Sequence, residues 1–483
     1  LSGALAAGIA GKTVRASDSA PLAFAANAMK RPKHVLLLMA DDLNLAIGAW
    51  GHPAARTPHL DRLAARGVRF SHAFCPYPLC GPSRTALLTG RRPESFPMGN
   101  NEVDWSAAAP GVRMLPEIAR AHGLHTERFG KIQHHGIPAG PEREVAEREG
   151  RLPHTLRHPP SWVREWGEVA GTYEPDAEGE DRVLHGRPHG GTSQHTRRVT
   201  NPEVLPDTLI ADHAVAFLQS DRAADPFLLG VGFHKPHVPF FAPESWWEHY
   251  DAIDVDPLFA PSAARPPEGM PPGAFLRSGF HRGLGEDDRR HLYRGYLASV
   301  SWMDEQLGRV IDALDASPAG DDTLIVFVAD HGYHIGEQGQ WDKMSLFEPS
   351  LRIPLIFAGA GIEHHGRTCA ELVESMDVYP TVCGLMGWDP DGHQATDLGP
   401  CLRDPGTVTD RVTHAWVNAG RRQGWSVRTR THRYSIMSWD GGDPQPMMFD
   451  LTADPHEMTN LAGRREHAAV ESDLAAEVKR FST

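Results

Sequence analysis

The chain has 483 residues and a formal net charge of −14, with 48 basic and 62 acidic side chains. This length supports a large core and two or three domains, and 47 glycines with 40 prolines are typical of a loop-rich globular enzyme. The acidic balance excludes the basic surface of a nucleic-acid-binding protein, and no apolar run approaches the roughly twenty residues that span a bilayer. An anionic substrate must therefore be captured by a local pocket.

The first segment, residues 1–30, is rich in alanine and glycine and contains a small-residue site at Val14-Arg15-Ala16. This pattern is typical of the apolar and cleavage regions of an export signal. We therefore expect a periplasmic or extracellular protein. A disordered N-terminal tail is the alternative interpretation of the same residues.

Residues 31–405 are expected to form one catalytic α/β domain. The continuous apolar run at residues 34–40 predicts a strand buried on both faces of a mostly parallel sheet, and it ends in Asp41-Asp42. A second such run at residues 323–329 ends in Asp330-His331. Ligands of open α/β sheets bind beyond the carboxyl ends of the strands, so these two ends are expected to share one site.

Further strands are predicted at residues 226–231 and 354–358, and amphipathic helices at 114–122, 207–219 and 289–314. This alternation favours a central sheet sandwiched by helices. The stretch 140–200 lacks a clear period and is interpreted as an excursion over the surface. Its basic residues either line a substrate entrance or belong to a solvated loop; they include Arg187, His189, His195, Arg197 and Arg198.

Beyond residue 405 the pattern changes to short strand-like pieces at residues 425–430, 434–439 and 449–451, followed by a helix at 466–481. Residues 406–483 are therefore predicted to form a small C-terminal α+β subdomain with an antiparallel sheet.

The motif CGPSRTALLTG at residues 80–90 carries the most specific chemical information. An isolated cysteine is usually a small buried hydrophobe, but cysteine, proline, arginine, threonine and glycine together at fixed offsets make chance a poor explanation. The motif resembles the signature at which sulfatases convert cysteine to formylglycine, which would make Cys80 the reaction centre. The other cysteines have no such context, and a disulfide among them is possible without an assignable pairing; they are Cys75, Cys369, Cys383 and Cys401.

The carboxylates of Asp41, Asp42 and Asp330 at buried strand ends require cations, and a hard divalent ion such as calcium prefers oxygen ligands of this type. A helix cap or turn is the alternative for the Asp41-Asp42 pair alone. His331 is the less secure ligand because imidazole suits transition metals better than calcium.

Four more blocks extend the resemblance over nearly the whole chain from Lys33. Three of them look like blocks of the iduronate 2-sulfatase branch of the sulfatase family: FGKIQHHG at 129–136, GFHKPHVPF at 232–240 and DHGYHIGEQGQWDK at 330–343. The fourth, DPHE at 454–457 followed by Asn460-Leu461, looks like the closing pattern of the family. The resemblance implies an alkaline-phosphatase-like fold with a small C-terminal subdomain.

The resemblance also implies roles for individual residues. The calcium ligands would be Asp41, Asp42, Asp330 and His331, with the modified Cys80 completing the set. Sulfate binding and proton transfer would be shared by five cationic or imidazole side chains, which are Arg84, Lys131, His134, His234 and Lys343. Asp42 would accept the proton of the formylglycine hydrate, His234 assisted by Lys343 would protonate the leaving alcohol, and His134 would help to expel sulfate. Supporting positions or substrate contacts are expected at His135, His237 and His334.

The expected function is hydrolysis of a sulfate ester on a sulfated sugar or polysaccharide, with a 2-O-sulfated uronic acid as one candidate, after modification by a formylglycine-generating or sulfatase-maturing enzyme. Two alternatives remain open at this point. One is a phosphonate or phosphodiester hydrolase on the same scaffold. The other is a noncatalytic glycan-binding protein that has lost turnover.

Overall fold

The structure is a computed structural model that describes residues 30–96, 98–101, 111–134, 164–166, 177–185, 194–259, 267, 269–271, 273–275 and 284–482. A nine-stranded sheet lies at its centre, with the strand order β12-β2-β13-β9-β1-β7-β3-β4 and with β14 paired to β2. Its strands are β1 (His34–Asp41), β2 (Gly67–Phe74), β3 (His125–Gly130), β4 (Arg164–Trp166), β7 (Phe227–Pro236), β9 (Thr323–Ala329), β12 (Arg352–Ile353), β13 (Leu355–Gly359) and β14 (Arg367–Glu374).

The middle of this sheet is parallel. Strand β1 pairs in parallel with β7 on one side and with β9 on the other, and β3 continues the parallel order beyond β7. Every residue of β1, β7 and β9 is buried, as the continuous apolar runs in the sequence predicted. Strand β13 is antiparallel to both β9 and β2, so the sheet is mostly and not wholly parallel.

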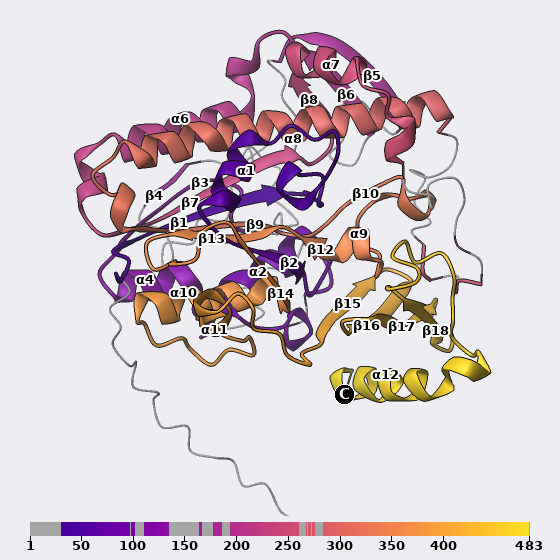
Figure 1. Cartoon of the computed structure of the whole chain (residues 1–483). Coiled ribbons are helices and arrows are strands. Elements are labelled where there is room, and N and C mark those ends of the chain that lie inside the picture. The colour runs from indigo at the N-terminus through magenta and orange to yellow at the C-terminus, as the bar shows by residue number, and fades with distance from the viewer. Residues whose placement is uncertain are drawn as a thin grey trace, which may run out of the picture.

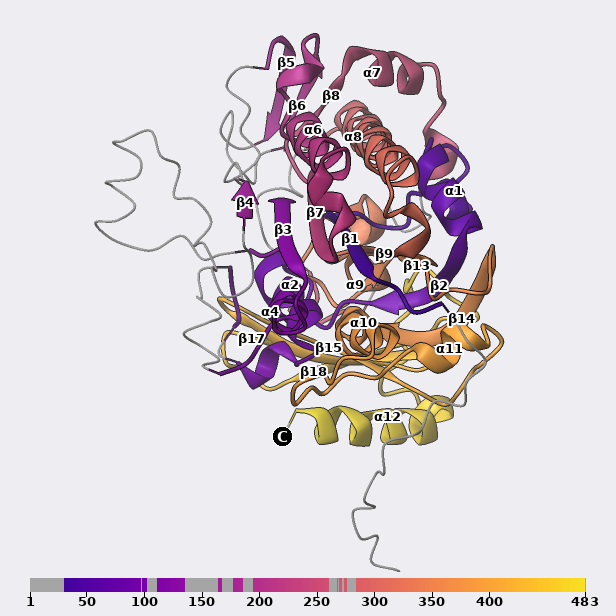
Figure 2. The same cartoon turned by 90° about the vertical axis from the view of Figure 1, so that its left-hand side faces the viewer.

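Helices cover both faces of the sheet (Figures 1 and 2). One face carries α1 (Pro58–Ala65), α6 (Pro206–Leu218) and α8 (Glu286–Asp315), and the other carries α2 (Cys80–Thr89), α4 (Leu115–Ala121), α10 (Val378–Met386) and α11 (Gly399–Arg403). The 30-residue α8 begins with three acidic side chains, which interact favourably with the positive end of a helix dipole. The predictions of helices at 114–122, 207–219 and 289–314 are confirmed within a few residues.

The described part of the excursion is more regular than its sequence suggested. Strands β5 (Gly179–His185) and β6 (Gln194–Val199) form a three-stranded sheet with β8 (Phe240–Pro243), beside α7 (Glu244–Asp251). His195 and Arg197 are buried and contact Asp181, and Arg198 pairs with Asp251. His195 and Arg197 therefore do not belong to a solvated loop, because the distant strand β8 completes their sheet and they are buried, whereas Arg198 is partly exposed. A substrate entrance at these residues stays a prediction. Arg187 and His189 lie outside the described residues.

The C-terminal sheet is antiparallel, as predicted. It consists of β15 (Thr413–Ala419), β16 (Arg422–Arg428), β17 (His432–Trp439) and β18 (Gln445–Asp450), in that order. Helix α12 (Ala468–Phe481) packs on its outer face, where Leu474 and Val478 join a separate small core (Figure 1). The division into residues 31–405 and 406–483 stays a prediction.

Short elements lie between β9 and β12 in the chain: β10 (His334–Ile335), β11 (Trp341–Asp342) and α9 (Glu348–Leu351). Glu348 of α9 pairs with Arg428 and Arg433 of the C-terminal sheet. All five cysteines lie in the described ranges and are buried and free, with the Cys369 and Cys401 thiols hydrogen-bonded to each other. No helix among the described residues combines the length and the apolar composition required to cross a membrane.

Candidate active site

Four neighbouring parallel strands deliver polar side chains to one edge of the sheet. Asp330 follows β9, Asp41 ends β1, His234 lies near the end of β7, and Lys131 follows β3. Directly after β1, Asp42 adopts a positive φ of 62°, a conformation that is uncommon for a residue with a side chain and often occurs at functional sites. This is the strand-end site that the sequence predicted for Asp41, Asp42 and Asp330.

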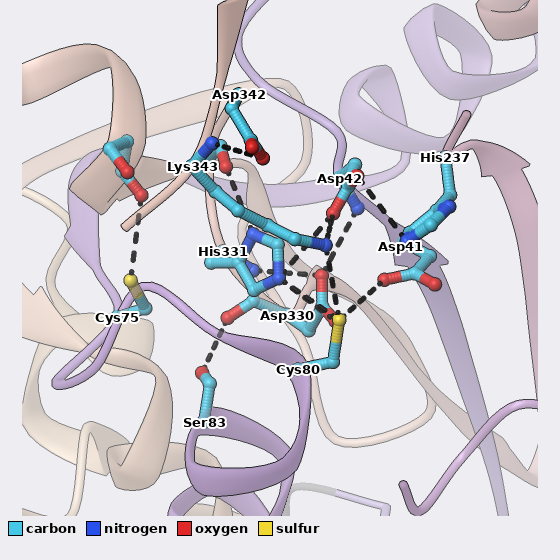
Figure 3. Close-up of polar contacts among 12 residues, drawn as sticks. Asp41, Asp42, Cys75, Cys80, Ser83, His237, Asp330, His331, Asp342 and Lys343 are labelled. Atoms are coloured by element: carbon cyan, nitrogen blue, oxygen red, sulfur yellow. Dashed lines mark hydrogen bonds and ion pairs between the residues drawn. The ribbon is translucent and has the colours of Figure 1, made fainter. Parts of the chain in front are cut away.

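Helix α2 brings Cys80 to the same edge. Cys80 is the first residue of the helix, and Arg84 lies one turn later on the same side, which places both next to the acidic residues. The Cys80 Sγ atom is 3.4 Å from Asp41 Oδ1 and 3.3 Å from His331 Nε2 (Figure 3). All ten residues of the helix are buried, so the thiol is fixed in a site that excludes bulk water.

The oxygen, nitrogen and sulfur atoms around Cys80 are arranged as a metal site would require. One potential ligand atom from each of Asp41, Cys80, Asp330 and His331 lies within 4.8 Å of the other three. The Nδ1 atom of His331 is 2.9 Å from the carbonyl oxygen of Gly332, so this nitrogen carries a proton, and Nε2 lies 3.4 Å from Asp42 Oδ1 and 3.5 Å from Asp330 Oδ2. Although burial opposes it, Asp330 raises the pKa of His331 to about 9, so Nε2 would have to give up its proton to bind a cation. The buried Oδ2 atom of Asp42 has no hydrogen-bond partner among the described residues, which fits a role as a cation ligand.

Three cationic side chains surround the same atoms. Lys343 Nζ lies 2.5 Å from Asp42 Oδ1 and 3.3 Å from Cys80 Sγ (Figure 3). Lys131 Nζ pairs with Asp41. Arg84 donates from Nε to Asp330 Oδ2 at 2.9 Å. Its Nη2 atom, 3.5 Å from Asp41 Oδ1, makes no hydrogen bond within the described part of the chain and remains a donor for an anion.

Burial and charge shift the pKa values of this cluster. Burial raises the pKa of Asp42 to about 8, against the opposing effect of Lys343. Burial and Asp41 also act to raise the pKa of the Cys80 thiol, but Lys131 and Lys343 outweigh them and hold it below its ordinary value. The site therefore favours negative charge at position 80, which is a property of an activated nucleophile.

His234 is fixed by its backbone. Its amide N–H donates to Asp207 Oδ1 at 2.7 Å, and the next amide, that of Lys235, donates to Asp207 Oδ2 at 3.1 Å. Burial, followed by the charge of Lys131, lowers the pKa of His234 to about 3, so the imidazole is neutral in the free protein. Its buried Nε2 atom has no hydrogen-bond partner in the described ranges, which leaves it available to a substrate.

The remaining histidines differ in position. His134 is partly exposed, three residues after Lys131, and His135 lies outside the described residues. The Nε2 atom of His334 is hydrogen-bonded to Ser345 Oγ at 2.7 Å, and this contact supports the loop that carries Lys343. His237 lies closer to the reaction centre than the sequence indicated, with Nε2 3.8 Å from Asp42 Oδ2. The only signal for it was its place in the GFHKPHVPF block.

Two supporting residues were missed in the sequence. Asp207 holds the amides described above, and Tyr296 in α8 donates its hydroxyl to the Asp42 carbonyl at 2.8 Å while accepting the amide of Asn44. Neither has a local motif, because each reaches the site through packing of a helix on the sheet. Tyr296 helps to hold the unusual backbone of Asp42 in place.

A mostly parallel sheet between two helical layers, with an acidic and cationic site around a helix-terminal cysteine, defines an α/β protein with a candidate active site for anionic esters. The sulfatase family model matches residues 33–388, and a model of the C-terminal part of N-sulphoglucosamine sulphohydrolase matches residues 336–483. The chain belongs to the sulfatase family and is a sulfuric ester hydrolase.

Individual relatives support this assignment. A sulfatase from Formosa agariphila is 31% identical over 89% of this chain and 83% of its own length. The human iduronate 2-sulfatase is 29% identical over 75% of this chain and 70% of its own length. Among solved structures, the phosphonate monoester hydrolase of Silicibacter pomeroyi has a TM-score of 0.71 at 21% identity and covers 93% of this chain and 94% of its own, which shows the shared fold alone.

Proposed function

We propose that the chain removes O-sulfate from a sulfated sugar or polysaccharide, with Cys80 converted to formylglycine and a calcium ion bound beside it. The observation that carries this proposal is the position of Cys80, within 3.4 Å of Asp41 and within 3.3 Å of both His331 and Lys343. A buried ordinary thiol has no evident reason to lie among three carboxylates and three cations.

The residues present fit a hard divalent cation. Asp41, Asp330 and His331, which cluster with Cys80, would hold it together with Asp42, which clusters with Cys80 and His237. The carboxylate oxygens that dominate this set are the ligands calcium prefers. The hydrate of formylglycine would supply a hydroxyl nucleophile. A bound cation would supply the positive charge that favours the ionised form of this hydroxyl. Asp42, with a carboxylate oxygen within 4.8 Å of the Cys80 sulfur, would accept the hydroxyl proton.

Arg84, Lys131 and Lys343 would bind the sulfate group. A sulfate ester is permanently anionic, and fixed buried donors stabilise the additional charge that develops on its oxygens during transfer. The free Nη2 of Arg84 is one such donor. Lys343 Nζ, next to both Asp42 and Cys80, lies where charge on the leaving oxygen could also be neutralised.

His234 would protonate the leaving alcohol, assisted by Lys343. The neutral state of His234 in the free protein is consistent with this role, because an anionic ester beside Nε2 opposes the effect of Lys131 and raises the proton affinity of the imidazole. His134, in the loop after β3, would accept the proton that accompanies release of sulfate. The order of these proton transfers follows from the family resemblance.

The substrate class follows from the similarity to iduronate 2-sulfatase, and a 2-O-sulfated uronic acid residue is the first candidate. The test is sulfate release from a set of defined sulfated oligosaccharides, with an aryl sulfate, a phosphodiester and a phosphonate for comparison. We expect sulfated sugars to be hydrolysed with the highest kcat/KM. Preferred hydrolysis of the phosphonate or phosphodiester would favour the phosphoryl-transfer alternative, and sugar binding without turnover by a fully modified protein would favour the glycan-binding alternative.

We also propose that the protein is exported to the periplasm or beyond the cell and is modified by a sulfatase-maturing enzyme. The composition of residues 1–30 supports export, and the CGPSR sequence at residues 80–84 supports modification. Fractionation of the native host tests the location: recovery in the cytoplasm alone would contradict export.

A further inference from the structure

One buried cation in the described structure is not used by the chemistry above. Arg422 begins β16 in the C-terminal sheet, and its side chain is 4% exposed. The Nε atom donates to the Gly273 carbonyl oxygen at 2.9 Å. Neither Nη1 nor Nη2 has a hydrogen-bond partner in the part of the chain that the structure describes. Buried polar atoms are nearly always paired, so a guanidinium with two free ends requires an explanation.

Arg422 lies near two residues of the segments that carry Lys343 and Cys80. Asp342 and Tyr77 are close enough to raise its proton affinity. Asp342 directly precedes Lys343, and Figure 3 shows these two residues side by side. Lys343 contacts the Cys80 sulfur. Tyr77 lies three residues before Cys80, and its hydroxyl accepts the amide of Asn418 in the neighbouring strand β15. The C-terminal sheet therefore brings Arg422 next to the catalytic loops.

The charge of Arg422 is incompletely balanced. Burial lowers its pKa to about 10 even though Asp342 and Tyr77 act in the opposite direction. An uncompensated buried cation is unfavourable unless an anion reaches it. The Gly273 carbonyl holds Nε, and the two Nη atoms are left as the planar pair of donors that binds a carboxylate or sulfate with two parallel hydrogen bonds.

We propose that Arg422 binds a second oxyanion on the substrate sugar, either a ring carboxylate or an additional sulfate, through Nη1 and Nη2. This inference rests on the proposed function and narrows its substrate class to sugars that carry a negative charge besides the sulfate that is removed. Arg422 is then a specificity residue supplied by the C-terminal sheet.

The test compares wild-type protein with Arg422→Met on three kinds of substrate: a 2-O-sulfated uronate disaccharide, the same disaccharide with its carboxyl reduced to an alcohol, and 4-nitrophenyl sulfate. A fourth substrate, the carboxyl-reduced disaccharide with a second sulfate added, distinguishes recognition of a ring carboxylate from recognition of an additional sulfate. We expect kcat/KM for the substrate with the recognised oxyanion to fall about 10- to 100-fold, mainly through KM. The decrease for 4-nitrophenyl sulfate should be at least tenfold smaller.

Two further variants control for folding. Arg421→Met removes the neighbouring arginine, which is exposed and paired with Asp440, and it should leave all kinetic constants near the wild-type values. Arg422→Lys retains the charge without the planar donor pair and should recover part of the lost affinity. The proposal would be overturned if Arg422→Met lowered kcat/KM equally for every substrate, or lowered it for none.

Binding of the same oligosaccharides to Cys80→Ala protein, measured by calorimetry with and without Arg422→Met, separates this proposal from the proposed function. Absence of sulfate release from every substrate by modified wild-type protein would contradict the function. Arg422-dependent binding in that case would still support the oxyanion site. Binding that does not depend on Arg422 would reject the site.

Discussion

A buried ion cluster joins the C-terminal sheet to helix α9 and allows a quantitative prediction. Arg433 in β17 pairs with Glu457 through Nε at 2.8 Å and with Glu348 of α9 through Nη2 at 2.5 Å. Arg428 adds a contact to Glu348 at 3.0 Å, and the Glu348 amide donates to Glu457 at 2.7 Å. The side chains of Arg433 and Glu457 are 1% and 0% exposed, so water cannot replace a lost partner.

Arg433→Met retains much of the side-chain volume and removes the charge between two buried carboxylates. Removal of one partner from a buried pair typically costs about 3–5 kcal/mol because the other charge is left uncompensated. We expect the free energy of unfolding at pH 8 to fall by about this amount, measured by denaturant titration with a probe of the C-terminal sheet such as tryptophan fluorescence. Glu348 keeps Arg428, so Glu457 is the more affected carboxylate.

The effect should depend on pH in a defined direction. Burial raises the pKa of Glu457 to about 7, and Arg433 opposes that rise. A carboxyl with a raised folded-state pKa stabilises the fold at low pH, and this contribution is lost as the pH rises through the folded-state value. Without Arg433 the pKa rises further, so the destabilisation should be larger at pH 8 than at pH 6. The exposed Arg421→Met variant is the matched control, and an equal, small effect of both variants would refute the reasoning.

Three other predictions concern the site. Asp207→Asn replaces one acceptor of the His234 and Lys235 amides by a donor, so kcat/KM should fall about 10- to 100-fold while the thermal midpoint changes little; wild-type kinetics would contradict a positioning role. Lys343→Met should lower kcat far more than the distant surface change Arg421→Met, and a change in KM alone would argue against a role in the chemical step. Chelation by EGTA should abolish sulfate release and lower the thermal midpoint, with recovery on addition of calcium; activity that survives complete metal removal would contradict the cation site.

The central part of the fold could be predicted from the sequence because its strands are buried on both faces. Such strands have continuous apolar runs, as in β1 and β9, and the acidic residues directly after them identify the site edge. The Cys80 motif is likewise local, since Cys80 and Arg84 lie one helical turn apart. These signals require no knowledge of which distant segments pack together.

Features that depend on distant contacts were not predictable. Strands β5 and β6 are rich in charged residues, and their sheet becomes evident only when β8 is placed beside them. Asp207 and Tyr296 look like ordinary helix residues until α6 and α8 dock on the sheet. Arg422 looks like a solvated charge next to Arg421, although one is buried and the other exposed. In each case tertiary packing, and not local pattern, determines the role.

The central claim is that Cys80 becomes an aldehyde that acts in sulfate release. The most direct measurement is the mass of the peptide containing Cys80, taken from protein of the native host whose sulfate release from a 2-O-sulfated uronate disaccharide has been assayed in the same preparation. We expect a peptide lighter than the thiol form, and activity that scales with the modified fraction. Full activity from protein that carries an unmodified thiol at position 80 would contradict the account.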